Sequence, residues 1–157
     1  MANANQARKH ATGMAGEFLV AGELLRRGIM AAVTYGNAKK ADVVAIHEGR
    51  SATIEVKTTS ESRWVLGNAL PPEGASRWVL VHLPTDLTQS PEYFVLTGTE
   101  LRGAVQPRHD AYNAAYMAKH GEPYSKLGVV SVLRNEIDDR HRGAWRKISA
   151  TLGTRDR

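Results

Sequence analysis

Two apolar runs joined by a short polar turn constrain the fold of this chain more than any other feature. "ADVVAI" covers residues 41–46 and "SATIEVKT" covers residues 51–58, and both are rich in β-branched side chains. Such runs favour strands, and the intervening "HEGR" is typical of a hairpin turn. Within this apolar pattern lie Asp42, Glu55 and Lys57. Charges in such positions either face solvent at an edge or are retained for chemistry.

The length of the turn decides which residues face each other across the hairpin. A loop of two residues, Glu48 and Gly49, or of four, residues 47–50, would place Asp42 opposite Glu55. A three-residue loop with a bulge would break that parity. An even loop therefore predicts two neighbouring carboxylates on one face.

A helix is predicted on the N-terminal side of the hairpin. Residues 14–27, "MAGEFLVAGELLRR", have helical apolar spacing, and Gly28 follows as a stop signal. Glu17 falls inside the apolar arc, which includes Phe18 and Leu25. Residues 1–13 are expected to form a flexible N-terminus.

The rest of the chain predicts an α/β fold with a central mixed β-sheet flanked by helices. Further strands are expected in "IMAAVTYG", "RWVLVHL", "EYFVLTG" and "LGVVSVL". Trp145, Ile148 and Leu152 predict a last helix packed on the sheet. Residues 106–126 are expected to form a partly ordered, exposed insertion, in which "AYNAAYMAKH" could form a short helix, within a single domain over residues 14–157.

Composition excludes several classes of function. The chain has no cysteine, which removes disulfides, thiol nucleophiles and cysteine-containing zinc sites, and is compatible with a cytoplasmic location. No signal peptide, membrane span or glycine-rich phosphate loop is recognisable, so neither a membrane nor a nucleotide cofactor is expected. Lys and Arg number 21 against 16 Asp and Glu, giving a net charge of +5. This moderate excess favours a polyanionic partner such as nucleic acid.

The residue types in the hairpin suit phosphodiester hydrolysis. Two adjacent carboxylates repel unless a cation lies between them, and hard oxygen ligands select Mg²⁺ or Mn²⁺. On a strand, Glu55 and Lys57 project to the same face. A lysine beside a metal can orient a water molecule or stabilise charge on a phosphate under attack.

Asp42, Glu55-Val56-Lys57 on a second strand and Glu17 on a preceding helix together resemble the PD-(D/E)xK nuclease superfamily, although Ala41 stands where the family name has proline. The resemblance implies a restriction-endonuclease-like core and a Mg²⁺-dependent nuclease acting on duplex or branched DNA. It implies that Asp42, Glu55 and Glu17 ligate the metal and that Lys57 activates or positions the water. Homodimerisation rests on that likeness alone.

Residues flanking the hairpin are candidates for DNA contact. Lys39, Lys40 and Arg63 could meet phosphates, and Trp64 could stack on a base or pack under a loop. A basic cluster near the C-terminus could also meet phosphates or form a solvated helix face; it comprises Arg140, Arg142, Arg146 and Lys147.

The same residues could also have purely structural roles. Glu55 and Lys57 could form an ion pair on a half-exposed strand, Glu17 could pair with an arginine, and Asp42 could merely begin its strand. The competing functions are a catalytically silent module of the same fold that binds nucleic acid or a protein, and a structural protein with no nucleic-acid role.

Overall fold

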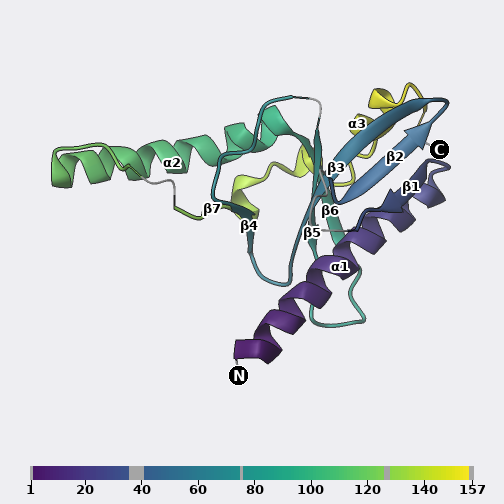
Figure 1. Ribbon diagram of the computed structural model, residues 1–157, viewed down its shortest axis with the longest axis horizontal. Coiled ribbons are helices and arrows are strands. Elements are labelled where there is room, and N and C mark those ends of the chain that lie inside the picture. Colours follow the sequence, from purple (N-terminus) through teal and green to yellow (C-terminus); the bar gives the residue numbers. More distant parts are fainter. Residues whose placement is uncertain (1, 36–40, 75, 126–127, 156–157) are drawn as a thin grey trace.

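A mixed β-sheet forms the centre of the computed structural model, which describes residues 2–35, 41–74, 76–125 and 128–155 (Figure 1). The sheet has the strand order β1-β2-β3-β5-β6, in which β3 and β5 are parallel and the other neighbours are antiparallel. Its strands are β1 (Met30–Val33), β2 (Val43–His47), β3 (Arg50–Thr59), β5 (Arg77–His82) and β6 (Glu92–Thr97). With helices on both faces, this confirms the predicted α/β class.

Two helices, α1 (Ala2–Arg26) and α3 (Arg146–Thr151), cover one face of the sheet. The buried core on this face joins both helices to β3, β5 and β6 through Val20, Ala21, Leu24, Ile54, Val56, Val79, Val81, Val95, Trp145, Ile148 and Leu152. The expected C-terminal helix is therefore confirmed, and it packs on the sheet as predicted.

Helix α1 departs from the sequence prediction in its length and its buried face. It begins at Ala2 instead of Met14, so residues expected to be flexible are helical and largely exposed. Ala, Gln, Arg and Lys, which are good helix formers, supply much of this first part. Phe18 and Leu25 are about half exposed because the helix contacts the sheet along a narrower stripe than the predicted arc.

The other face of the sheet carries α2 (Gly98–His120) and a second small sheet of β4 (Arg63–Gly67) and β7 (Val130–Leu133). Their shared core contains Trp64, Leu66, Trp78, Leu80, Phe94, Leu96, Leu101, Val105 and Val132. The sequence reading predicted β7 but not β4. Two 3₁₀ turns, η1 (Arg134–Glu136) and η2 (Asp139–His141), lead from β7 towards α3.

The expected insertion over residues 106–126 is wrong, because most of it continues α2. The helix starts with a capping box between Thr97 and Glu100 and ends at Gly121, whose φ of 73° is left-handed. Pro107 removes the hydrogen bond to the carbonyl of Gly103. Gly103 is exposed, so water can satisfy that carbonyl and the helix continues.

A buried polar cluster connects α2 to α3. Lys147 Nζ donates to Glu100 Oε2 at 2.7 Å and to the carbonyl of Val95 at 3.1 Å, and it lies 2.7 Å from Nδ1 of His141. Burial alone would raise the pKa of Glu100, but hydrogen bonds from Lys147 and Thr97 lower it to about 2. Burial, followed by the charge of Lys147, lowers the pKa of His141.

The cluster predicts a loss of stability in acid. Because the folded-state pKa of Glu100 is depressed, its contribution is present above its ordinary pKa of 4.5 and is lost as pH falls towards about 2. The depressed pKa of His141 acts in the same direction below about 6.5. Urea unfolding between pH 7 and pH 3 should show a decreasing free energy of unfolding. The Glu100→Gln variant should show a shallower decrease, and an equal slope would contradict the assignment.

Helix α1 crosses β3 where Gly16 meets Thr58. A Cβ atom built at Gly16 would overlap the side-chain oxygen of Thr58, so only glycine permits this approach. The crossing fixes Glu17, the next residue of α1, at the C-terminal half of β3.

We expect Gly16→Ala to destabilise the protein by about 1–3 kcal/mol, because the new methyl group would push α1 away from β3. Gly22→Ala is the matched control, since a Cβ at Gly22 meets nothing within 4 Å. It should stabilise α1 by about 0.5–1 kcal/mol. Chemical denaturation measures both, and equal effects from the two variants would refute the close crossing.

Candidate active site

The hairpin of β2 and β3 has the even loop that the sequence left open. His47 pairs with Arg50 across a two-residue turn of Glu48 and Gly49. Both turn residues have positive φ, at 45° and 78°, as a tight hairpin of this twist requires. The predicted pairing of Ala45 with Ala52 is confirmed, and the ladder continues to Val43 and Ile54.

At Asp42 the pairing differs from the simple prediction. The backbone N–H of Asp42 donates to the carbonyl of Ile54 at 3.0 Å, although Ile54 is already the partner of Val43. Asp42 and Val43 thus both lie opposite Ile54 of β3. This irregular pairing turns the Asp42 side chain towards β3. Its Oδ2 accepts the backbone N–H of Val56 at 2.8 Å. The carboxylate therefore contacts the segment Glu55–Val56 directly.

The backbone around Asp42 is held from both sides. Its carbonyl accepts the N–H of Thr34 at 2.9 Å, and the hydroxyl of Thr34 donates to the carbonyl of Ala41. Asp42 is only 8% exposed. A buried carboxylate must be hydrogen-bonded, and Val56 supplies one such bond. The position of the Asp42 carboxylate is therefore set by three neighbouring strands.

Glu55 and Lys57 project to one face of β3, as predicted. Ile54 and Val56 point into the core under α1, so the alternate residues Glu55 and Lys57 face the opposite side. They pair with Trp78 and Leu80 of β5 and are both partly exposed. A carboxylate and an ammonium group thus share one partly solvated surface at the end of β3.

Glu17 approaches the same end of β3 from the other face. It follows Gly16, which contacts Thr58, and its side chain is partly exposed. The backbone N–H groups of a strand point within the plane of the sheet. Because the Asp42 carboxylate accepts the N–H of Val56, it lies at the edge of the sheet, between the two faces. Glu17 thus belongs to the helix on one face of the sheet, whereas Glu55 and Lys57 project to the opposite face.

The donor set suits a hard divalent cation held by a small number of protein ligands. In the described part of the chain, no group of three or more His, Asp or Glu side chains is positioned to hold a metal ion. Mg²⁺, however, is commonly bound through one or two carboxylates, with water and substrate phosphate completing its octahedron. Asp42 and Glu55 are the two carboxylates of this hairpin, and both offer oxygen atoms of the kind that Mg²⁺ prefers.

Of the four residues predicted to contact DNA, one is buried, one is exposed and two lie outside the described residues. The prediction that Trp64 stacks on a base is wrong. Its side chain is 1% exposed, and its indole N–H donates to the carbonyl of Val81 at 2.9 Å, so no base can reach the ring. Apolar strand neighbours bury it once residues 63–67 form β4. Arg63 is exposed at the start of β4. Lys39 and Lys40 lie outside the described residues.

The basic C-terminal cluster is mostly engaged in internal pairs. Arg142 contacts Glu92, Arg140 lies 3.8 Å from Asp138, and Lys147 belongs to the buried cluster with Glu100. These contacts are structural, and neither of the two sequence readings foresaw them. Arg146 is exposed at the start of α3.

Sequence reasoning missed a group of aromatic residues on α2 and the segment after it. Tyr112 and Tyr116 are four residues apart and so share one side of the helix. Tyr124 contacts both rings, with centroid distances of 5.3 and 4.8 Å. The i, i+4 spacing is visible in "AYNAAYMAKH", for which the sequence allows a short helix, but Tyr124 follows the end of the helix and its contact with both rings has no signal in the sequence.

Comparison with known proteins gives similarity at the level of the fold. No protein-family model and no curated protein matches the chain. A bacterial homing endonuclease is similar over 90% of this chain and 91% of its own, with 15% identity and a TM-score of 0.49. A Holliday junction resolvase from the archaeal hyperthermophile Archaeoglobus fulgidus is similar over 92% and 98%, with 13% identity and a TM-score of 0.47. At these values the function has to be argued from the residues themselves.

No helix in the described residues is long and apolar enough to cross a membrane.

The hydrogen bond between Asp42 and Val56 predicts different effects for two substitutions. Asp42→Ala would leave the Val56 N–H buried without a partner and should reduce the free energy of unfolding by about 1–3 kcal/mol. Asp42→Asn keeps an oxygen acceptor and should stay close to the wild type. Urea denaturation and amide exchange at Val56 measure both variants. Equal protection of the Val56 amide in Asp42→Ala and the wild type would contradict the bond.

Proposed function

We propose that this protein is a Mg²⁺-dependent endonuclease that hydrolyses phosphodiester bonds in DNA, with Mn²⁺ as a substitute ion. The observation that carries the proposal is the contact of the buried Asp42 carboxylate with the Val56 N–H, between Glu55 and Lys57 in the sequence. This contact brings the two hairpin acids and the lysine to one end of β3. The resemblance of these residues to PD-(D/E)xK nucleases supports the same conclusion.

Each residue has a chemical role in this proposal. Asp42 and Glu55 would hold the metal, whereas Glu17, which the structure does not bring into one ligand group with them, would act from the α1 side only through metal-bound water. The metal, when bound, supplies charge stabilisation at the attacked phosphate and lowers the pKa of a bound water. Lys57 would position or deprotonate that water and would attract the phosphate as a fixed positive charge. Its partly exposed position on β3 suits a group that must reach substrate.

The charge of the protein supports DNA as the partner. The net charge is +5, and Arg63 is exposed six positions beyond Lys57. Exposed cations release counterions from a nucleic-acid backbone, which supplies affinity without sequence preference. Lys39 and Lys40 precede Asp42 closely and are proposed as further phosphate contacts. Cleavage of both strands would require two copies of this single site, so we also propose a homodimer.

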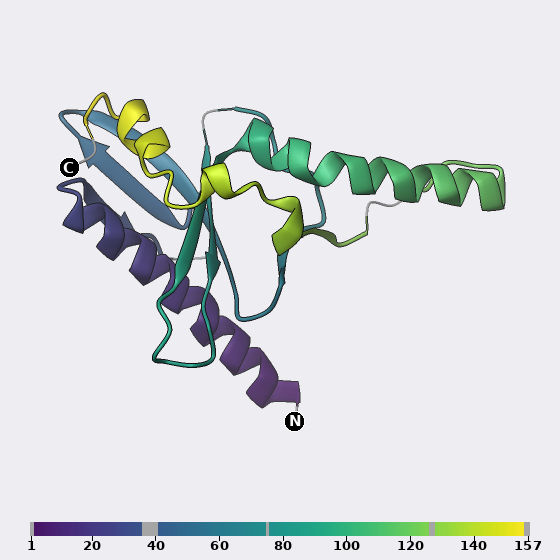
Figure 2. The ribbon, with the colours of Figure 1, turned by 180° about the vertical axis from the view of Figure 1, so that it is seen from behind.

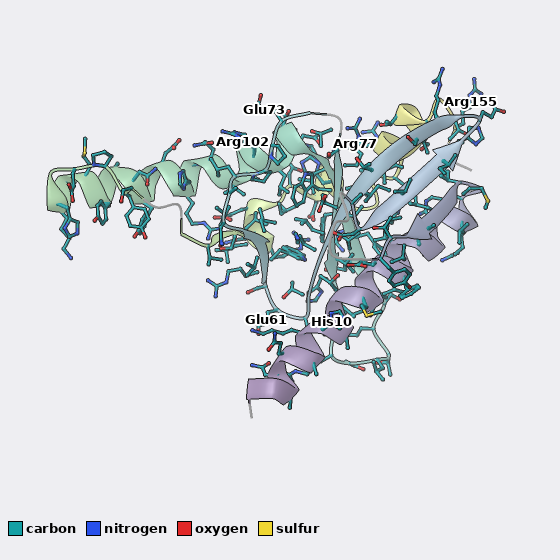
Figure 3. The ribbon with its side chains drawn as sticks, in the orientation of Figure 1. His10, Glu61, Glu73, Arg77, Arg102 and Arg155 are labelled. Carbon is teal, nitrogen blue, oxygen red and sulfur yellow. The ribbon has the colours of Figure 1, made fainter. Side chains whose placement is uncertain are left out.

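A cleavage assay with Glu55→Gln and Lys57→Met tests the site. Plasmid and branched DNA are incubated with wild type or variant in Mg²⁺, Mn²⁺ or EDTA. We expect metal-dependent cleavage by the wild type and a loss of about 100-fold or more in each variant, as for removal of a group acting on the transition state. Glu61→Gln is the matched control, since Glu61 is an exposed acid in the turn after β3 (Figure 3) and should leave the rate unchanged.

The same samples separate the alternative functions. Circular dichroism and salt-dependent DNA binding establish that each variant is folded and able to bind. Metal-independent binding with no cleavage on any substrate would contradict the nuclease proposal and favour the catalytically silent module. The absence of salt-sensitive DNA binding would overturn DNA as the partner. Light scattering at several concentrations tests the dimer.

A further inference from the structure

The second half of α2 projects away from the sheet as an arm. Figures 1 and 2 show the helix extending far beyond the body of the protein, with the chain that follows it returning alongside. The residues of α2 that are buried, Gly98, Leu101 and Val105, all lie in its first half. The projecting half therefore contributes little to the core, and its side chains are available for another role.

A pocket of about 310 Å³ lies between α2 and the returning chain. Its walls are formed by Val105, Arg108, His109, Tyr112, Tyr124 and residues 128–131. This volume is at the lower end of the range for small-molecule sites, so it suits one planar group and excludes a helix or a duplex. None of the described residues that line the pocket is acidic.

The aromatic walls are held in fixed positions by one another. Tyr124 meets Tyr112 edge-on, with an interplanar angle of 87° and a centroid distance of 5.3 Å. Tyr116 contacts Tyr124 and also stacks on His120 at 4.3 Å. Tyr112 nevertheless remains 53% exposed. A flat ring that is supported behind and open in front is the arrangement on which a planar ligand stacks.

Polar groups of the same helix, one turn before Tyr112, are oriented as well. Arg108 is fixed by Glu136 and by the carbonyl of Ser131 at 3.0 Å. The ring of His109 lies 3.2 Å from the amide of Asn113. The pocket thus combines an aromatic surface with a guanidinium and an imidazole group. An aliphatic side chain of a protein partner would use neither, whereas a nucleotide can use both.

We propose that this pocket binds an unpaired nucleobase of a nucleic-acid strand, stacked on Tyr112 with its backbone towards Arg108 and His109. The occupant is a single-stranded or flipped-out nucleotide, because stacking on a protein ring requires a base freed from its neighbours. The inference rests on the proposed action on DNA. It adds a second contact on the arm, away from the β2–β3 hairpin, which favours substrates that combine duplex and unpaired segments.

Binding measured in EDTA tests the pocket independently of catalysis. Fluorescence anisotropy is recorded with a labelled single-stranded oligonucleotide and with its duplex, and with 2-aminopurine to detect stacking. We expect Tyr112→Ala to weaken single-strand binding about tenfold or more, a loss typical of one removed stacking platform. Tyr112→Phe should retain binding. Tyr35→Ala is the control, since Tyr35 is 69% exposed outside the pocket and should have no effect.

The outcomes distinguish this inference from the nuclease proposal. Equal single-strand affinity of Tyr112→Ala, Tyr35→Ala and wild type would overturn the pocket, even if plasmid cleavage continues. Loss of cleavage in Glu55→Gln with unchanged 2-aminopurine quenching would support both. Quenching that depends on Tyr112, without cleavage by any form, would support the pocket and reject the nuclease. Concentration-dependent self-association that disappears in Tyr112→Ala, with DNA binding unaltered, would assign the pocket to a second copy and refute the proposal.

Folding of the variants is checked by thermal unfolding. Tyr112 is half exposed, so its truncation should leave the core on β5 and β6 intact. Tyr124→Ala provides a second route to the same conclusion, because it removes the edge that supports Tyr112. The two variants should weaken single-strand binding to a similar degree. A loss confined to Tyr124→Ala would contradict stacking on Tyr112.

Discussion

The hydrogen bond from the Val56 N–H to the Asp42 carboxylate is the contact on which the candidate site depends. Strand β2 begins at Val43, opposite Ile54, while β3 continues to Thr59, so beyond Ile54 the edge of β3 that faces β2 has no strand partner among the described residues, although the other edge stays paired with β5. Asp42 replaces the missing carbonyl with its side chain. A charge can be tolerated there because the backbone donor partly compensates for its burial. The same geometry that completes this edge of the sheet therefore positions the carboxylate that we propose as a metal ligand.

Helix α1 passes over this part of the sheet and adds an acidic residue, Glu17, to the residues near it. The absence of a side chain at Gly16 lets the helix pass directly over Thr58, in the part of β3 that extends beyond its pairing with β2. Glu17 is then carried to the edge by the backbone of the helix and not by a flexible loop. Rigid elements hold catalytic geometry better than loops do. Acids from one helix and two strands are thus held by elements that also build the core.

The sequence was sufficient for the parts of the site that depend on local periodicity. Period-2 alternation identified β2, β3 and the shared face of Glu55 and Lys57, and an even loop correctly paired Ala45 with Ala52. The irregular pairing of Asp42 with Ile54 has no periodic signal, because it arises from competition between backbone and side-chain acceptors at a strand end.

Failures elsewhere in the chain have a common origin in tertiary context. Residues 106–120 are polar and contain Pro107, which argues against a helix locally, but a capped and buried first half carries the helix through them. Trp64 follows a polar stretch, residues 60–63, and it is enclosed once β4 pairs with β7. Neither outcome could follow from a window of neighbouring residues.

The distribution of ion pairs decides which cations can serve a substrate. Arg26 and Arg27 are paired with Glu23, and Arg102 of α2 is paired with Glu73 (Figure 3). The C-terminal cluster is likewise largely occupied by Glu92, Asp138 and Glu100. A paired cation must give up its partner to bind phosphate, which reduces the net gain. In the proposed function, the attraction of DNA would therefore rest on exposed cations such as Arg63, at the start of β4, more than on the C-terminal cluster.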